Sequence, residues 1–300
     1  MAELTVAKGS SVSLLYAMED SWAVLPSSPT VYNVRATRFS VNLSKDTFTS
    51  NELRSDRQLA ELRTGMKSIS GNIDVELIYG AFDDFIESAM FNTWSSAGDI
   101  QVGLEKKSFT LQRGFENISV HNAFSGCVVN QWSVSIRPNA VVTSTFSVIG
   151  KDMGNTEVLT GGANPSNYAP FDSFTGTIKE GGSTIGIVTG FDFTLNNNIN
   201  SLNVLMQDTA AGLAEGRANV TGTLTAYFAN SNLLDKFINE TESSIEITLT
   251  DINSNSLTFY FPRIKYTGGD VSVNDEGPIT ISLPFTALKH DTYTTLYITR

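Results

Sequence analysis

The sequence is poor in the residues that most catalytic and metal sites require. Its 300 residues include one cysteine, Cys127, and two histidines, His121 and His290. A single cysteine cannot form an internal disulfide and leaves no cysteine pair for zinc, which is typical of a protein that matures in a reducing compartment. Neither main type of glycine-rich phosphate loop occurs. We therefore predict a protein with no metal, no cofactor and no catalytic residues.

Charged residues are also scarce, and basic ones are the scarcer kind. They make up 17% of the chain, with 20 basic and 31 acidic residues and a net charge of −11. A protein that grips nucleic acid needs a basic face, because phosphate contacts dominate its affinity. We expect no specific binding of DNA or RNA.

Long apolar runs are missing as well. No run approaches the roughly 18 residues that a membrane helix needs. The first twenty residues lack the basic region and apolar core of a signal peptide. We expect a soluble protein that accumulates in a cytoplasm.

The chain does have the amino-acid composition of a β-rich protein and the alternation of apolar and polar residues that is typical of β-strands. Hydrophobic residues make up 41%, and Ser, Thr and Asn supply much of the polarity. Between Asn72 and Tyr79, apolar and polar residues alternate, and the same pattern returns in residues 132–136 and 279–283. Strands of this kind cover a core with one face and meet water with the other.

Five landmarks of the first half recur in the same order in the second half. The spacing between copies stays near ~150 residues, the size of one ordinary domain. We predict two tandem domains, residues 1–155 and 156–300, joined in the turn-rich stretch 154–168. The matched segments are Phe39–Leu43 with Phe191–Leu195, Ser70–Leu77 with Thr221–Phe228, the helical patterns of residues 82–89 and 234–238, Ser108–Leu111 with Ser256–Phe259, and Phe146–Asp152 with Phe285–Asp291.

Each domain is predicted to be a mainly β sandwich or barrel with one short α-helix. In the first helix Phe82, Phe85, Ile86 and Ala89 share a face, and Leu234, Phe237 and Ile238 do so in the second. A hairpin is expected between residues 174–179 and 184–195, around Gly181 and Gly182. Small sheets leave exposed edges, and a ring of subunits that closes them into one barrel removes those edges.

Three groups of residues could be taken for chemical sites, and each has a simpler structural explanation. His121 and Cys127 are close in sequence, but no nucleophile motif surrounds them. Acidic residues within 83–87 suit the start of a helix, where the dipole favours negative charge. Residues 251–255 resemble a calcium loop but lack its glycine and terminal glutamate, so a hairpin turn explains them better.

Two long connections stand out from this regular pattern. Residues 45–68 far exceed the usual hairpin loop of about 2–5 residues, and loops of such length generally serve a function. This loop mixes charges of both signs with apolar residues, which fits contact with another copy of the protein, although a merely solvated loop would look similar. The polar loop 196–219 occupies the same place in the second half. The candidate contact residues are Glu52, Leu53, Arg54, Asp56, Arg57, Gln58, Glu61 and Arg63.

Several of these segments together resemble the major tail tube proteins of long-tailed, siphovirus-type bacteriophages, in their duplicated-domain branch. The resemblance depends on SNELRSDRQ after a strand, on TGTLTAYF with the NLLDKFIN helix after it, and on the hairpin GGSTIGIVTGFDFTLNNN. The segment that runs from Glu19–Trp22 to Pro26 and Pro29 fits the family too. The resemblance covers both halves of the chain.

The resemblance implies a structural virion protein that assembles with itself. Three chains would form a pseudo-hexameric ring, and stacked rings would form the tail tube, the conduit for genome delivery. It implies tape measure, tail terminator and tail tip proteins as partners, assembly in the host cytoplasm, and DNA that passes without being bound. The candidate contact residues of the loop 45–68 would then reach the neighbouring ring.

A conduit for DNA should offer phosphates no counter-charge. The polar strand faces supply that property, and the candidate lumen-facing residues are Asn72, Asp74, Glu76, Thr223 and Thr225.

Two other functions stay open from the sequence. A head–tail connector ring or a decoration protein would share a β-rich, self-assembling design. A carbohydrate-binding or glycosidase β-domain could use Trp22, Trp94 and Trp132 as sugar platforms, and a retaining glycosidase would need two carboxylates about 5–5.5 Å apart.

Overall fold

The computed structural model describes residues 6–52, 55–56, 58–59, 61–272 and 276–300. Within these residues the chain is mainly β, with two short α-helices, α1 (Asp83–Met90) and α2 (Asn232–Ile238). Two 3-10 turns, η1 (Gly9–Ser11) and η2 (Glu116–Ile118), precede strands of the first half. The prediction of a mainly β fold with one short helix in each half is confirmed.

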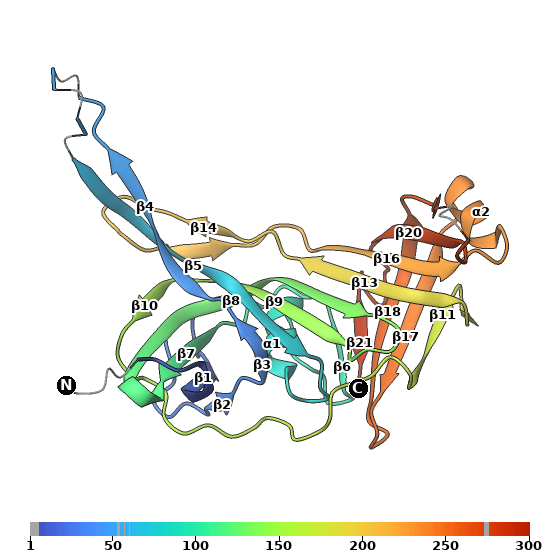
Figure 1. The fold of residues 1–300 in the computed structure, drawn as a ribbon, viewed down its shortest axis with the longest axis horizontal. Coiled ribbons are helices and arrows are strands. Elements are labelled where there is room, and N and C mark those ends of the chain that lie inside the picture. Colours follow the sequence, from blue (N-terminus) through green and yellow to red (C-terminus); the bar gives the residue numbers. More distant parts are fainter. Residues whose placement is uncertain (1–5, 53–54, 57, 60, 273–275) are drawn as a thin grey trace.

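One central antiparallel sheet runs through both halves of the chain (Figure 1). β3 (Ala36–Phe39) and β4 (Asn42–Thr49) lie along one of its edges, and the end of β18 (Ser256–Tyr266) and β19 (Asp270–Ser272) lie along the other. Between these edges the strands follow the order β5 (Leu62–Glu76), β9 (Thr143–Gly150), β8 (Val120–Ile136), β13 (Val188–Asn196), β16 (Asn219–Tyr227) and β20 (Thr280–Ala287).

Two further sheets complete a sandwich, one in each half. β8 and β18 belong to two layers each, because their first residues lie in an outer sheet and their last residues in the central one. The first outer sheet contains β2 (Tyr32–Asn33), β1 (Val12–Met18), β7 (Phe109–Phe115), the start of β8, and β10 (Asp152–Gly154). The second contains β12 (Ser183–Thr184), β11 (Gly176–Glu180), β17 (Ser243–Thr250), the start of β18, β21 (Tyr297–Thr299) and β6 (Asp99–Gln101).

The core fills the space between these layers. On the buried side of the central sheet, Ile73, Phe146, Trp132, Leu195 and Val220 stand opposite one another in a row across five strands. All five are at most 1% exposed. Burying each such side chain stabilises the fold by about 1.5–3 kcal/mol. The central sheet does not close into a barrel within the described residues.

The helices differ in how deeply they pack. The ring of Phe85 on α1 lies between the layers, 4.8 Å from that of Tyr16, 4.9 Å from that of Phe109 and 5.5 Å from that of Phe146, measured between centroids. The predicted buried face of α1 is therefore correct. On α2 the buried residue is Leu233, whereas Ile238, expected to face the core, is 63% exposed. α2 lies at the rim of its half, so only part of its apolar side meets the core.

The two long connections form hairpin arms instead of loops (Figure 1). Within 45–68, β4 continues to Thr49 and β5 begins at Leu62, so the two strands pair well beyond the body. Within 196–219, β14 (Asn200–Leu202) pairs with β15 (Gly212–Ala214). Outside the body both faces of such a strand meet water, so no apolar alternation marks it in the sequence.

The hairpin predicted after residue 174 is shorter than expected. β11 turns into β12 at Gly181 and Gly182, whose φ angles of 58° and 80° suit a type I′ turn. β12 ends at Thr184, and the chain then moves to the central sheet as β13.

The segment that follows the predicted domain boundary at residue 155 packs on the first half. The backbone N–H groups of Val158 and Leu159 donate to Oε1 of Gln112, at 2.9 and 2.8 Å. Phe171 is fully buried, and its N–H donates to the carbonyl of Leu77. Residues 158–171, assigned from the sequence to the second domain, therefore make their contacts with the first.

Candidate functional site

The polar residues of the central sheet lie on one uninterrupted face. Directly opposed residues of paired strands point to the same side of a sheet, so the pairing register defines rows of side chains. Each member of these rows is half-buried or exposed. The rows are Asn72, Ser147, Gln131, Asn196 and Asn219; Asp74, Thr145, Ser133, Thr194, Thr221 and Thr286; and Glu76, Thr143, Ser135, Asp192, Thr223 and Pro284.

This polar face, defined by the three rows, brings together the lumen candidates of both halves. Asn72, Asp74 and Glu76 begin the rows on β5, and Thr223 belongs to the third row on β16. Thr225 is one step further along β16, opposite Ser282 of β20. Residues 147 to 153 positions apart in the sequence, such as Glu76 with Thr223 and Asn72 with Thr225, therefore share one surface.

The polar face carries negative charge. Its rows contain the carboxylates of Asp74, Glu76 and Asp192. Two basic side chains stand at the ends of the second row, Arg38 opposite Asp74 and Lys265 opposite Thr286. Arg137 follows the end of β8, and its Nη2 lies 2.6 Å from Oδ2 of Asp192. Thr145 Oγ1 donates to Oδ1 of Asp74 at 2.8 Å. Asp192 is not among the residues predicted to face the lumen, although its position between Phe191 and Phe193 indicates a polar face.

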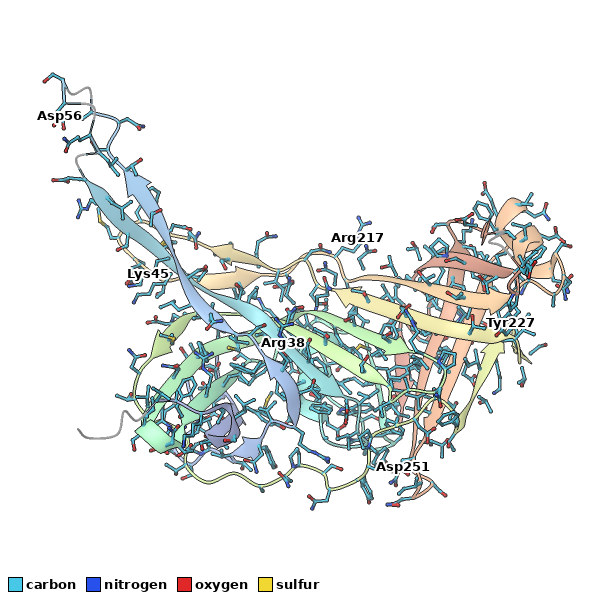
Figure 2. All side chains as sticks on the ribbon, in the orientation of Figure 1. Arg38, Lys45, Asp56, Arg217, Tyr227 and Asp251 are labelled. Carbon is cyan, nitrogen blue, oxygen red and sulfur yellow. The ribbon has the colours of Figure 1, made fainter. Side chains whose placement is uncertain are left out.

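The first arm, formed by β4 and β5 beyond Lys45, carries most of the predicted contact residues. Figure 2 shows Lys45 part of the way along this arm and Asp56 at its far end. Apolar side chains are exposed beside the tip, with Phe48 at 61% and Leu62 at 57%. Glu52, Asp56, Gln58 and Glu61 lie at the tip and Arg63 on β5, while Leu53, Arg54 and Arg57 lie outside the described residues.

The second arm, formed by β14 and β15, folds back along the first half. The backbone N–H of Lys67 donates to the carbonyl of Asp208 at 2.7 Å, and Nζ of Lys67 lies 2.9 Å from Oδ2 of Asp208. Nζ of Lys106 donates to the carbonyl of Leu213 and to Oε2 of Glu215, both at 2.6 Å. These contacts join residues more than 100 positions apart, which is why sequence patterns did not reveal them.

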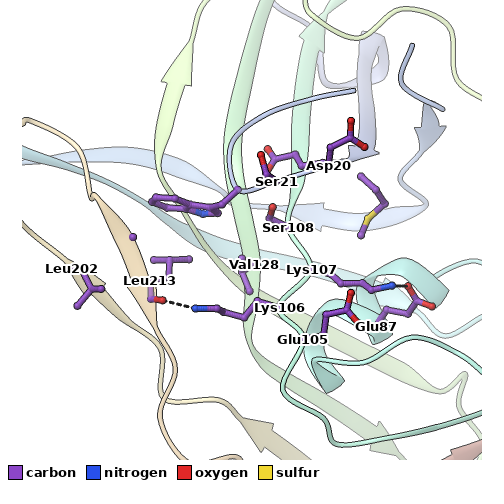
Figure 3. A pocket seen from close by; sticks show the side chains of 14 residues that line it. Asp20, Ser21, Glu87, Glu105, Lys106, Lys107, Ser108, Val128, Leu202 and Leu213 are labelled. Carbon is purple, nitrogen blue, oxygen red and sulfur yellow. Dashed lines mark hydrogen bonds and ion pairs between the residues drawn. The ribbon is translucent and has the colours of Figure 1, made fainter. Parts of the chain in front are cut away.

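A pocket of about 600 Å³ lies between this arm and the first half (Figure 3). Apolar and polar residues both line it, among them Trp22, Val128 and Leu213. Two of its lysines are paired within the protein, Lys106 as described and Lys107 with Oε2 of Glu87 at 2.9 Å. The pocket is thus bordered by contacts that join the second arm to the body.

We expect the second arm to loosen when these ion pairs are removed. Asp208→Asn with Glu215→Gln should make the backbone amides of Lys67 and Gly216 exchange roughly two- to tenfold faster. Exposed ion pairs contribute little to the stability of the whole protein, but their loss should make this arm open more often. Hydrogen exchange followed by mass spectrometry measures this. Glu242→Gln, which breaks the exposed pair with Arg263, is the control and should leave both amides unchanged.

The same ion pairs give this arm a defined pH dependence. Hydrogen bonds from Lys67 and Lys106 hold the pKa of Asp208 below its ordinary 3.8 and that of Glu215 below 4.5. Their stabilisation is complete above those ordinary values and is lost as the pH falls through the lowered folded-state values. Loss of protection in the arm, measured as the exchange rate relative to the intrinsic rate at each pH, should therefore appear only in acid.

His121 and Cys127 do not form a pair. Both lie on β8, six residues apart, which corresponds to about 20 Å along a strand. Burial raises the pKa of the Cys127 thiol, and Nε2 of His121 lies 3.9 Å from Oε2 of Glu157. Nδ1 of His290 accepts the backbone N–H groups of Thr292 and Tyr293.

The acidic residues considered for metal binding have partners within the protein. Asp83 forms an ion pair with Arg300, and Oδ2 of Asp84 accepts the Tyr16 hydroxyl at 3.0 Å. Burial raises the pKa of Asp84. Oδ1 of Asp251 accepts the N–H groups of Asn253 and Asn255, both at 2.8 Å, within the turn between β17 and β18. The hairpin turn predicted there is confirmed.

Among the residues that the structure describes, no three His, Cys, Asp or Glu side chains are grouped so that they could hold a metal ion. The described helices are likewise too short or too polar to cross a membrane.

Comparison with known proteins identifies the family. The chain is a mainly β sandwich with a polar face and a projecting hairpin, and the family model described as phage tail tube protein matches residues 9–287. The chain belongs to this family. It is a structural component of the phage tail, where such proteins assemble with one another and with other tail proteins. A search of curated proteins returned no match.

Proposed function

We propose that three copies of this chain close into a ring with pseudo-hexameric symmetry, and that stacked rings form the tail tube through which the genome leaves the virion. The observation that carries this proposal is the polar face, which continues across both halves without a break. A surface of this kind, curved into a ring, would give a channel lining of uniform chemistry.

The chemistry of the polar face supports its assignment to the lumen. Hydroxyl and amide groups bind phosphates weakly, and Asp74, Glu76 and Asp192 repel them. Arg137 is paired with Asp192, with 2.6 Å between Nη2 and Oδ2. Arg38 and Lys265 stand at the two ends of the second row, opposite Asp74 and Thr286. DNA would therefore meet a wall that is polar and acidic in its middle, with basic side chains only at its two edges.

The pairing order supports two equivalent domains per chain, divided between β10 and β11, with residues 158–171 packed on the first. In the first half the central strands pair in the order β4, β5, β9, β8, and in the second half in the order β13, β16, β20, β18. In each set the chain visits the first, second, fourth and third strand in turn. Two such units in each of three chains give six similar units around a ring.

The first arm is suited to contact the adjacent ring. It projects from the body, ends in charges of both signs, and exposes Phe48 and Leu62 beside its tip (Figure 2). Complementary charges fix register and orientation, while apolar side chains supply burial. Tape measure, tail terminator and tail tip proteins are the further partners, and assembly takes place in the host cytoplasm.

Electron microscopy of the purified chain tests the proposal. We expect open-ended tubes with a central channel. Single rings that do not stack would favour a connector, and particles that stay monomeric under all conditions would contradict self-assembly.

A change of charge tests whether the polar face lines the channel. Thr145→Lys, Thr194→Lys and Thr221→Lys together should give tubes that bind linear duplex DNA at least about tenfold more tightly at low salt, because each lysine adds a phosphate contact. Gel-shift titration measures this, and the same three threonines changed to glutamine are the control. Circular DNA has no free end that could enter a tube. Equally tight binding of circular DNA would therefore show that the lysines lie on the outer surface of the tube and not in its channel.

A further inference from the structure

The central sheet ends in two edges whose outer sides pair with no strand among the described residues. At one edge the N–H of Ser40 donates to the carbonyl of Asn72 on β5. Because backbone groups alternate along a strand, those of Val41 and Leu43 point away from the sheet. At the other edge the N–H of Thr267 donates to the carbonyl of Pro284 on β20, so the groups of Tyr266 point outward.

The pairing of β8 with β13, which joins the two halves, provides a template for joining these edges. There Thr194 stands opposite Ser133, Leu195 opposite Trp132, and Asn196 opposite Gln131. The N–H of Asn197 donates to the carbonyl of Asn130, which places Leu195 and Trp132 in a hydrogen-bonded pair by alternation.

The free edge at β4 corresponds to β13 in this template. Asn42 stands opposite Ser70 on β5, and Thr194 stands opposite Thr221 on β16. Ser70 and Thr221 begin matched sequence segments, so Asn42 corresponds to Thr194. Two residues further on, Ser44 corresponds to Asn196.

The free edge at the end of β18 corresponds to β8. Ser133 stands opposite Thr145 on β9, and Thr267 bonds to Pro284 on β20. Phe146 and Phe285 are matched in sequence, so Thr145 corresponds to Pro284 and Ser133 to Thr267. Gln131 then corresponds to Lys265, which stands opposite Thr286.

We propose that Asn42–Ser44 of one copy pairs antiparallel with Lys265–Thr267 of the next copy, with Asn42 opposite Thr267 and Ser44 opposite Lys265. This inference rests on the proposed ring, and it adds which edges meet and in which register. The partner is a second copy of this chain because the join between its own halves already has the required geometry. The polar face then continues through the junction, since Asn42, Ser44 and Thr267 are exposed polar residues and Lys265 is half-buried.

Cysteine cross-linking tests this register. Asn42→Cys with Thr267→Cys, and Ser44→Cys with Lys265→Cys, place two thiols at opposed, non-hydrogen-bonded positions, where Cα atoms are about 4.5 Å apart and a disulfide fits. The exchanged pairs, Asn42→Cys with Lys265→Cys and Ser44→Cys with Thr267→Cys, use the same four sites but are about 7–8 Å apart. Native Cys127 is fully buried and does not compete.

Full-length variants are assembled under reducing conditions, checked for tubes by electron microscopy, oxidised, and separated on non-reducing gels. We expect the matched pairs to give at least about tenfold more cross-linked chain than the exchanged pairs. For a three-membered ring, the ladder should end at the trimer.

The outcomes separate the register from the proposed function. Tubes with equal cross-linking of matched and exchanged pairs would overturn this register and leave the tube function standing. Tubes in which one of the exchanged pairs cross-links and the matched pairs do not would show a shift of two residues, in the direction given by that pair, and would also overturn it. If the wild-type chain forms no tubes, the proposed function itself fails.

Discussion

Trp132→Ala is expected to lower the free energy of unfolding by about 3–5 kcal/mol, the range found when large aromatic side chains are removed from cores. Trp132 is fully buried. Its ring stacks on that of Phe146 in the first half at 5.8 Å and meets those of Phe193 and Phe259 in the second half at 5.4 and 6.0 Å. The loss should therefore weaken both halves and the join between them. Urea unfolding followed by circular dichroism measures it.

Trp94→Ala is the matched control for this experiment. Trp94 is half-buried, and the Arg300 guanidinium lies 4.4 Å from its ring centroid. Trp94 packs at the margin of the core and is only partly buried, so its removal takes less apolar surface out of the core and should cost less than the loss of Trp132. Similar losses for the two variants would contradict the role of Trp132 as the shared centre of the core.

Shortening the first arm should abolish tube elongation without unfolding the subunit. Ser44 and Ser68 stand opposite each other in a hydrogen-bonded pair, so residues 45–67 can be replaced by Asn-Gly, which closes a two-residue hairpin. The removed segment is mostly exposed and contributes little to the core. We expect an unchanged circular dichroism spectrum and at least about tenfold fewer sedimentable tubes. The shortened arm would lose all of its contacts with the adjacent ring at once.

A milder variant separates the charges of the tip from its length. Arg54→Ser, Asp56→Ser and Arg57→Ser together should also stop elongation if the charges fix the register between rings. Arg54→Lys with Arg57→Lys keeps the charge and should still assemble. Tubes of normal length from the shortened arm would show that ring stacking uses another surface.

Local alternation predicted the body of the sheet well. Asn72, Asp74 and Glu76 were assigned to a polar face because each lies between apolar residues, and the structure places all three on that face. The same criterion failed for the arms, where Phe48 and Leu62 are exposed and no core selects one side of the strand. It also failed for Ile238, whose helix lies at the rim, where burial depends on neighbours distant in sequence.

The sequence by itself determined which segments become strands, which of their faces are polar, and the short helices, because these properties follow from residues a few positions apart. Only the tertiary structure decided that the polar faces of both halves merge into one surface, and that Lys67 and Lys106 hold the second arm against the first half. The reason is that sheet register and ion pairs between distant segments depend on how the whole core packs. The apolar and polar pattern of a strand determines which of its faces meets the core and which meets water. It does not determine which other strand lies beside it.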